Sequence, residues 1–471
     1  MRKYKLEPYR IIYNAEIKLV SPLIIGSGID ENSNNDVMKD KKGNPFVPAT
    51  SFAGILKHHF EDNYKKANCW EKLFGFSENY ADENGSGSKI IFSNLILKSA
   101  GADIRIRDGI RIDNKTGITE DAAKFDYEVV EPDINFSFKI EIQSDEENFI
   151  KSFVKTLERD IKIGEISLGA KTKSGFGRIE FLSSKTDFYN LNEKEDILKW
   201  ISRNENLINL DEISLLISNS KNLIINFDFF IKDSLIVKHY SEDPKSVDSE
   251  HIKSNGKNII PGTSIKGAIR ARAERIVKTL GVDDDGKFLL FLFGNSMKDF
   301  NKDKPEKESK KDKGSIPSRL SINEVRIEQK VKPSIQQRIK INRFTGGTID
   351  GALFESMPIF AENEIKSNRM QIKIENPVDA EIGLLLLILK DFWTGDLPIG
   401  GEKNVGRGVL KGLKIEILQV DNRIEIDDFL KLSEENANKL QKYVSILNEA
   451  DFENHIKYYE GIYEEILNER E

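Results

Sequence analysis

Pro261-Gly-Thr-Ser-Ile-Lys-Gly-Ala-Ile-Arg270 is the stretch of sequence that decides how this chain folds. It predicts the end of a strand, a tight turn and the start of a helix, with Thr263 or Ser264 as the N-cap. A helix that begins in this way directs free backbone N–H groups and the positive end of its dipole outward. With Lys266 and Arg270 on the first turns, the stretch predicts an anion site that suits a phosphate.

The same phrase occurs earlier in the chain as Pro48-Ala-Thr-Ser-Phe-Ala-Gly-Ile-Leu-Lys57, at a separation of 261 − 48 = 213 residues. Other landmarks also occur twice and in the same order: Leu73-Phe-Gly75 and Leu292-Phe-Gly294, residues 116–125 and 345–354, and residues 168–177 and 399–408. Matched landmarks in one order indicate a tandem duplication.

Each copy reads as strand, helix, strands, helix and strand, with a long polar excursion in the middle. This order predicts an α+β protein with two ferredoxin-like modules, which resemble RNA-recognition domains but lack their aromatic strand motif. We expect modules at residues 1–190 and 221–420, a helical linker at 191–220 and a helical C-terminal appendage at 421–471. The charged run 299–313 is expected to be an insertion loop of the second copy.

Composition limits the class of protein. A chain of 471 residues is too long for one ordinary core, and 38% hydrophobic with 32% charged residues predicts soluble, packed domains. No apolar run reaches membrane length and no signal-peptide core follows Met1, so a cytoplasmic location without a membrane partner is expected. Cys69 is the only cysteine, which excludes disulfides and cysteine zinc sites within the chain. The adjacent His58 and His59 are interpreted as a solvated helix face.

These motifs together resemble the RAMP (repeat-associated mysterious protein) superfamily, over residues 9–182 and 221–418. The phrase at Pro261 and the Gly-rich loop from Leu168 to Arg178 carry most of the resemblance. More narrowly, the chain looks like a backbone subunit of the type III CRISPR effector complexes, of the Csm and Cmr kind. Two such modules in one chain resemble the fused subunits of type III-D systems.

The resemblance implies a role in antiviral defence, in a ribonucleoprotein complex that contains CRISPR RNA (crRNA), complementary target RNA and other effector subunits. It also implies that each excursion acts as a thumb between guide and target. A metal-dependent endoribonuclease activity is implied as well, through an aspartate in the loop before the Pro-Gly-Thr-Ser turn. Asp248 fits this pattern as the catalytic residue and as a ligand of Mg²⁺ or Mn²⁺.

In the first copy the corresponding candidate is Asp36, which lies 12 residues before Pro48, whereas Asp248 lies 13 residues before Pro261. If the register is strict, an asparagine occupies the catalytic place and the first module only binds RNA.

The chemistry needs few groups, because RNA can be cut by its own 2′-OH. A loop carboxylate can remove the proton or hold one position of a hydrated metal ion, so no histidine partner is required. His251 could assist catalysis, but the interpretation of His251 as a residue on a strand face is favoured. The alternative for Asp248 is that it only begins a turn.

Candidate RNA-binding residues lie in three settings, and for each the alternative is an ordinary surface charge or a solubilising turn. Those at the two repeated turns are Thr50, Ser51, Lys57, Thr263, Ser264, Lys266 and Arg270. Those in the two Gly-rich loops are Lys171, Lys173, Arg178, Lys403 and Arg407. Those in the excursions are Arg111, Lys115, Arg338, Lys340 and Arg343.

Three functions remain open on these grounds: an RNA-guided ribonuclease subunit, a non-cleaving crRNA scaffold of the same complex, and a stand-alone RNA-processing endonuclease of the superfamily. A general acid–base histidine beside a Gly-rich loop would favour the third, and neither loop contains one.

Overall fold

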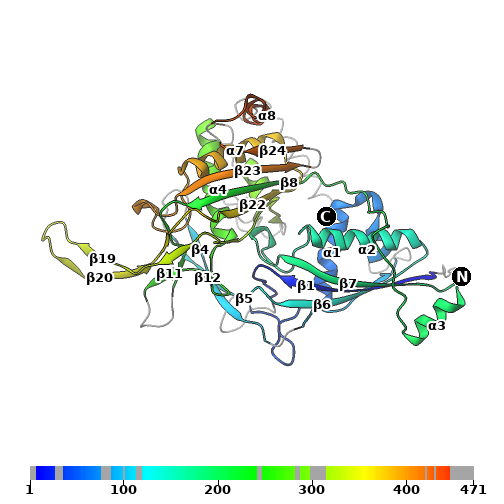
Figure 1. Ribbon diagram of the computed structural model, residues 1–471. Coiled ribbons are helices and arrows are strands. Elements are labelled where there is room, and N and C mark those ends of the chain that lie inside the picture. The colour runs from blue at the N-terminus through cyan, green and yellow to red at the C-terminus, as the bar shows by residue number, and fades with distance from the viewer. Residues whose placement is uncertain are drawn as a thin grey trace, which may run out of the picture. The chain divides into compact units, whose positions relative to one another are not determined.

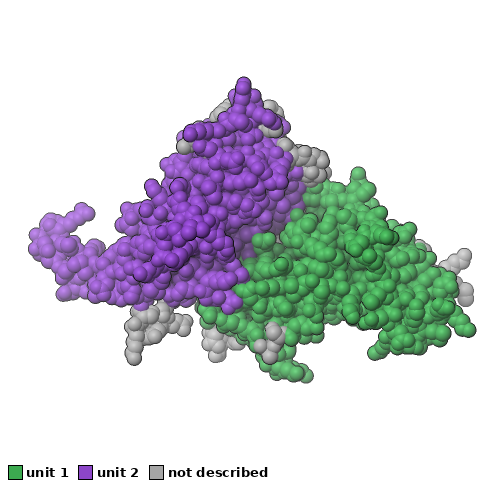
Figure 2. All heavy atoms as spheres, in the orientation of Figure 1, with its two compact units in different colours: residues 1–172, 176–220 green, residues 173–175, 221–471 purple. Residues whose placement is uncertain are grey.

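The computed structural model describes residues 7–26, 36–75, 86–98, 101–112, 119–240, 247–281, 287–296, 315–419, 422–428 and 431–445. The chain forms two compact units, which Figure 2 colours separately. Unit 1 comprises residues 1–172 and 176–220, and unit 2 comprises residues 173–175 and 221–471.

Unit 1 contains the β-α-β-β-α-β order of a ferredoxin-like module. The sheet order is β2-β6-β1-β7, with antiparallel neighbours throughout, and β3 also pairs with β6. The elements of unit 1 are β1 (Tyr9–Leu19), α1 (Ala49–Asn63), η1 (Lys65–Ala67), η2 (Trp70–Phe74), β2 (Ile90–Phe92), β3 (Ile96–Leu97), β4 (Ile104–Ile112), β5 (Thr119–Val130), β6 (Asn135–Ser144), α2 (Glu147–Lys162), η3 (Thr172–Ser174, of which 173 and 174 are grouped with unit 2), β7 (Ile179–Asn190) and α3 (Lys194–Ser202).

Strict alternation of side chains produces the core of unit 1. Every second residue of β6 is buried, from Phe136 to Ser144, because neighbouring strand residues point to opposite faces of a sheet. α1 buries Phe52, Leu56 and Phe60, which are spaced four residues apart and so share one helix face. Figure 1 shows α1 and α2 on the same side of this sheet.

Unit 2 repeats this architecture and adds an edge strand, in the order β16-β22-β8-β23-β24. Its elements up to the insertion are β8 (Leu223–Ile231), β9 (Ser234–Leu235), β10 (Lys238–His239), β11 (Ser249–His251), β12 (Lys253–Ser254), β13 (Lys257–Ile260), α4 (Gly262–Leu280), α5 (Lys287–Phe293) and β14 (Asn295–Ser296). Those after it are β15 (Ser315–Ile316), β16 (Leu320–Ile322), β17 (Val325–Arg326), β18 (Val331–Pro333), β19 (Gln336–Ile341), β20 (Thr348–Met357), β21 (Ile359–Ala361), β22 (Asn368–Ile374), α7 (Asp379–Thr394), η4 (Lys403–Val405), β23 (Leu410–Gln419), β24 (Asn422–Ile426) and α8 (Glu434–Ser445). The prediction of two tandem ferredoxin-like modules is confirmed.

The polar excursions are antiparallel two-stranded ribbons, β4–β5 in unit 1 and β19–β20 in unit 2. The second ribbon extends away from the rest of unit 2 (Figure 1). Lys340 lies exposed on β19, and the side chain of Arg111 on β4 is outside the described residues.

Two predicted segments differ from the structure. Residues after 421 do not begin an appendage: β24 pairs with β23, and α8 buries Leu440 and Tyr443 in the core of unit 2. The alternation of Ile424 and Ile426 indicates a strand, and the sequence analysis missed this pattern. Residues 446–471 and the predicted insertion loop 299–313 lie outside the described part of the chain.

The linker 191–220 is helical only over α3, whose C-cap Arg203 has a left-handed conformation (φ 55°). The remainder contains turns and irregular backbone and belongs to unit 1, where the backbone N–H of Leu216 donates to Thr156 Oγ1 at 2.9 Å. The Asn- and Ser-rich composition of this segment does not favour helix.

A close side-chain contact joins the two helices in each unit at equivalent positions. In unit 2 Arg272 Nε lies 2.5 Å from Asp391 Oδ2, and in unit 1 His59 Nε2 lies 2.7 Å from Asp160 Oδ2. His58 is exposed as expected, but the prediction of a solvated face is wrong for His59, because Asp160 reaches it from α2. Among the described residues, no helix is long and apolar enough to cross a membrane.

Candidate functional site

The repeated turn has the same backbone geometry in both units. Pro48 (φ −58°, ψ 141°) and Pro261 (φ −59°, ψ 138°) are the N-caps of α1 and α4. The prediction that Thr263 or Ser264 caps α4 is wrong by two to three residues. The fixed φ of proline suits this N-cap, and Pro261 O accepts the N–H groups of Ser264 and Ile265 at 3.0 and 3.2 Å.

The polar residues of the turns are therefore in the first helical turn. Thr50, Ser51 and Thr263 are exposed, and Ser264 is half-buried. At the start of α1, one of the N–H groups that lack a helical acceptor is bonded to a side chain instead, because Ala49 N donates to Asn94 Oδ1 at 2.8 Å.

The two cations of α4 have different surroundings. Lys266 Nζ donates to Ser318 Oγ at 2.7 Å and to Leu320 O at 2.9 Å, and burial lowers the pKa of Lys266 to about 8. Arg270 is partly exposed and lies 3.5 Å from Glu274. The half-buried Lys57 on α1 also has an interaction partner. Arg270 is thus the better placed of the two α4 cations to meet an RNA phosphate.

The Gly-rich loops use their glycines to approach the chain's own backbone. A Cβ on Gly177 would lie 1.7 Å from Leu168 O, and one on Gly408 would lie 1.8 Å from Ile399 O. Their N–H groups donate to Pro22 O and Ser234 O, both at 2.7 Å. This internal docking explains the glycines without a contact to RNA.

The cations of the first Gly-rich loop are partly engaged. Lys171 Nζ lies 3.6 Å from the centre of the Tyr127 ring, and Lys173 forms an ion pair with Glu375 within unit 2. Burial lowers the pKa of Lys171 and of Arg178.

In the second loop, Arg407 is only 3% exposed. Its Nε donates to Glu402 Oε2 at 2.9 Å and its Nη1 to Ser234 Oγ at 3.0 Å, and it also bonds to Gln336. A guanidinium with these partners fixes the loop to the base of the β19–β20 ribbon. Lys403, next to Glu402, stays exposed.

Glu402 is the centre of this junction, and the sequence analysis missed it. Lys238 Nζ lies 3.3 Å from Oε1, and Arg338 Nη2 lies 2.8 Å from Oε2. Desolvation alone would raise the pKa of Glu402, but the Arg407 hydrogen bond and the charges of Arg338 and Lys238 outweigh it and lower the pKa. The sequence feature that could have identified Glu402 is that it is one acidic residue among the cations of a Gly-rich loop.

Asp248 lies at the base of the same ribbon. It is exposed and immediately precedes β11, which runs parallel to β20 with Ser249 opposite Ser356. This register places Asp248 beside Glu355, whose backbone N–H donates to Asp248 Oδ2 at 2.8 Å. Glu355 Oε1 in turn accepts from Gln337 Nε2 at 2.6 Å. Asp248, Glu355 and Gln337 thus form one cross-strand row, of which only Asp248 was predicted.

His251 anchors the strand that follows Asp248. It is 2% exposed, its Nδ1 accepts the N–H of Val237 at 3.2 Å, and its Nε2 donates to Ile259 O at 2.9 Å. Burial lowers the pKa of His251 to about 4, so the ring is neutral. The interpretation of His251 as a strand residue is confirmed.

Backbone pairing fixes the register of the first copy. Ile252 N donates to Val237 O and Ile259 N to Ile252 O, and the same two bonds join Met38 N to Ile25 O and Phe46 N to Met38 O. Met38 is therefore equivalent to Ile252. Asp36 then takes the position of Glu250, and the position of Asp248 corresponds to Asn34, which lies outside the described residues.

The donor set around Asp248 suits a hydrated divalent ion better than an all-protein cage. Within the described part of the chain, no group of three or more His, Cys, Asp or Glu side chains could hold a metal. Mg²⁺ commonly keeps several waters and binds through one or two carboxylates, which Asp248 and Glu355 could supply.

The family model of the RAMP superfamily matches residues 16–180 and 215–411, once in each unit. No curated protein matches the chain at a significant level.

Proposed function

Because this chain belongs to the RAMP superfamily, we propose that it is a backbone subunit of a type III CRISPR effector complex. In this proposal the chain holds crRNA and cleaves complementary target RNA at unit 2. The observation that carries it is the exposed carboxylate of Asp248, oriented by the Glu355 N–H at the base of the ribbon.

The geometry leaves Asp248 one oxygen for chemistry. Oδ2 accepts the Glu355 N–H, and no described residue bonds to Oδ1. A carboxylate held in this way can accept the proton of a 2′-OH or orient a water of a bound Mg²⁺ or Mn²⁺. The attacking 2′-OH then forms a bond to the adjacent phosphorus, and the 5′ oxygen of the next nucleotide leaves.

Only unit 2 carries this arrangement in the proposal. Asp36 is at the position of Glu250, and the backbone N–H of Val37 donates to the side chain of Glu128 at 2.9 Å. Unit 1 is proposed to bind RNA without cutting it.

The alternative is a non-cleaving scaffold, since a purely structural aspartate would also accept the Glu355 N–H. A stand-alone processing enzyme is less well supported, because His251 is buried and bonded at both ring nitrogens.

The test uses Asp248→Asn, which keeps an oxygen acceptor for the Glu355 N–H but removes the charge. The full chain is purified with its bound nucleic acid, the guide is sequenced, and a complementary RNA is supplied with Mg²⁺ or Mn²⁺. We expect guide and target binding to be retained and the cut opposite unit 2 to disappear, whereas Asp36→Asn leaves the product pattern unchanged. If Asp248→Asn cuts as well as the parent, the scaffold function replaces the nuclease.

A further inference from the structure

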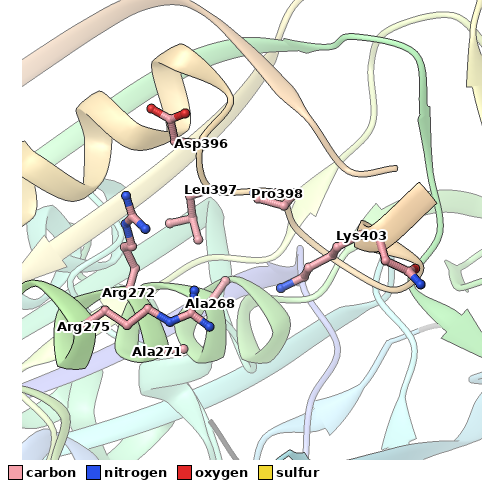
Figure 3. A pocket seen from close by; sticks show the side chains of 9 residues that line it. Ala268, Ala271, Arg272, Arg275, Asp396, Leu397, Pro398 and Lys403 are labelled. Carbon is pink, nitrogen blue, oxygen red and sulfur yellow. The ribbon is translucent and has the colours of Figure 1, made fainter. Parts of the chain in front are cut away.

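A half-open hollow of about 350 Å³ lies in unit 2 between α4 and the segment that joins α7 to the Gly-rich loop. Its volume is at the small end of the range for small-molecule sites. Its apolar lining is formed by Ala268 and Ala271 of α4 together with Leu397 and Pro398. Figure 3 shows Arg275 and Lys403 directed into this space from opposite sides.

The charges around the hollow do not cancel. Arg272 is paired with Asp391, and Asp396 on the rim is paired with Lys390 at 3.3 Å. Arg275 and Lys403 have no carboxylate partner among the described residues. Two uncompensated positive charges therefore face an apolar lining.

These two cations also face each other. Although the Lys403 side chain is largely exposed, partial desolvation of its ammonium group and then the charge of Arg275 lower the pKa of Lys403. An anion between them would remove this repulsion and add charge-assisted hydrogen bonds.

Unit 1 lacks this combination at the equivalent positions. The helix offset relates Arg275 to Asp62 (275 − 213 = 62), and the loop offset relates Lys403 to Thr172 (403 − 231 = 172). The side-chain contact between the two helices is kept as His59–Asp160, so the scaffold is common to both units while the two cations are not.

From these observations we propose that the hollow of unit 2 binds the phosphate of a nucleotide between Arg275 and Lys403. The apolar lining of Ala268, Ala271, Leu397 and Pro398 takes the sugar and base, and the Asn404 side chain on the rim offers an amide to them. The site requires neither a guide RNA nor cleavage at Asp248. The nucleotide is either free or part of an RNA strand, since both present the same chemistry.

The test compares the full-length parent with Arg275→Gln/Lys403→Gln. The matched control is Lys330→Gln/Lys366→Gln, which removes two exposed lysines of unit 2 away from the hollow (71% and 67% exposed). After removal of bound nucleic acid, binding of 5′-AMP is measured by equilibrium dialysis and binding of a ten-nucleotide single-stranded RNA by fluorescence anisotropy. Equal thermal midpoints establish that all three proteins are folded.

We expect the Arg275/Lys403 variant to lose at least tenfold in affinity and the control to change less than twofold. If the occupant is a strand, the RNA arm responds and its log–log salt slope falls by about 0.7, the value for one phosphate contact on a single strand. If the occupant is a free nucleotide, the AMP arm responds. Adenosine, which lacks the phosphate, then binds the parent no more tightly than it binds the Arg275/Lys403 variant. Equal binding of both ligands by the variant and the control overturns the proposal. Asp248→Asn leaves these affinities unchanged, so failure here is distinguishable from failure of the cleavage proposal.

Discussion

Replacing His251 by Gln should remove an acid-sensitive step from the unfolding of unit 2. The folded pKa of His251 is lowered by burial from the ordinary 6.5 to about 4. Above pH 6.5 the ring is neutral in both states, so it causes no pH dependence there. Below pH 6.5 the unfolded chain binds a proton that the folded chain does not, so stability falls until the pH reaches the folded value.

The size of this effect follows from the width of that window. A difference between 6.5 and about 4, at about 1.4 kcal/mol for each pH unit, gives a loss of roughly 3 kcal/mol between pH 6.5 and 4. At pH 7.5 the same substitution should cost about 1–2 kcal/mol, because the hydrogen bonds to Val237 and Ile259 are weakened or lost.

The assay is urea unfolding at pH 7.5, 6.0 and 4.5, followed by the fluorescence of Trp393 in a background in which Trp70 and Trp200 are Phe. Trp393 packs against the core of unit 2 and so reports on that unit. The control is His58→Gln in unit 1, where the side chain is 79% exposed. The reasoning is refuted if His251→Gln and its parent lose the same free energy of unfolding between pH 6.0 and 4.5.

Two further outcomes follow from the site. Gly408→Ala should cost roughly 3 kcal/mol or more, because φ is +79° and the new Cβ would lie 1.8 Å from Ile399 O. Gly406→Ala should cost only about 1–2 kcal/mol, since φ is +84° but nothing lies within 4 Å of its new Cβ. Urea midpoints measure both costs, and equal costs would contradict the close docking of Gly408 against Ile399. Lys266→Met should lower the urea midpoint of unit 2, because Ser318 Oγ and Leu320 O each lose the hydrogen bond that Lys266 Nζ donates, whereas Arg270→Gln should instead flatten the salt dependence of RNA binding. If the Lys266 variant flattens the salt dependence and the Arg270 variant lowers the midpoint, then Lys266 rather than Arg270 contacts RNA.

The sequence was sufficient to predict the duplication and the module fold, because both depend on local signals that occur twice. Strand alternation, the Pro-Thr-Ser turns and the loop glycines are each short-range patterns, and their common order fixed the topology. Prediction of secondary structure failed where a pattern occurred in only one of the two copies. The isoleucines of β24 lacked a counterpart in the first copy, and an acidic, Asn-rich surrounding suggested a helical tail.

The site was harder to predict, because side-chain partners there come from distant segments. Arg407 looks like an RNA contact in the sequence, yet Glu402, Ser234 and Gln336 engage its guanidinium. Lys266 is similar, since Ser318 and Leu320 lie more than 50 positions away. Charge and spacing identify a loop as cationic, but only the folded contacts decide which cations remain available.

The second copy also provides an internal comparison for assigning function. Where the two units agree, as in the proline N-caps and the docked glycines, the fold itself requires the residue. Where they differ, the fold permits either residue, and a different selective reason is needed. Two such differences concern Arg275 against Asp62 and Lys403 against Thr172. Arg275 and Lys403 thus belong to unit 2 alone, the unit that also carries Asp248, so the proposed nucleotide binding and the proposed strand cleavage are tested in the same half of the chain.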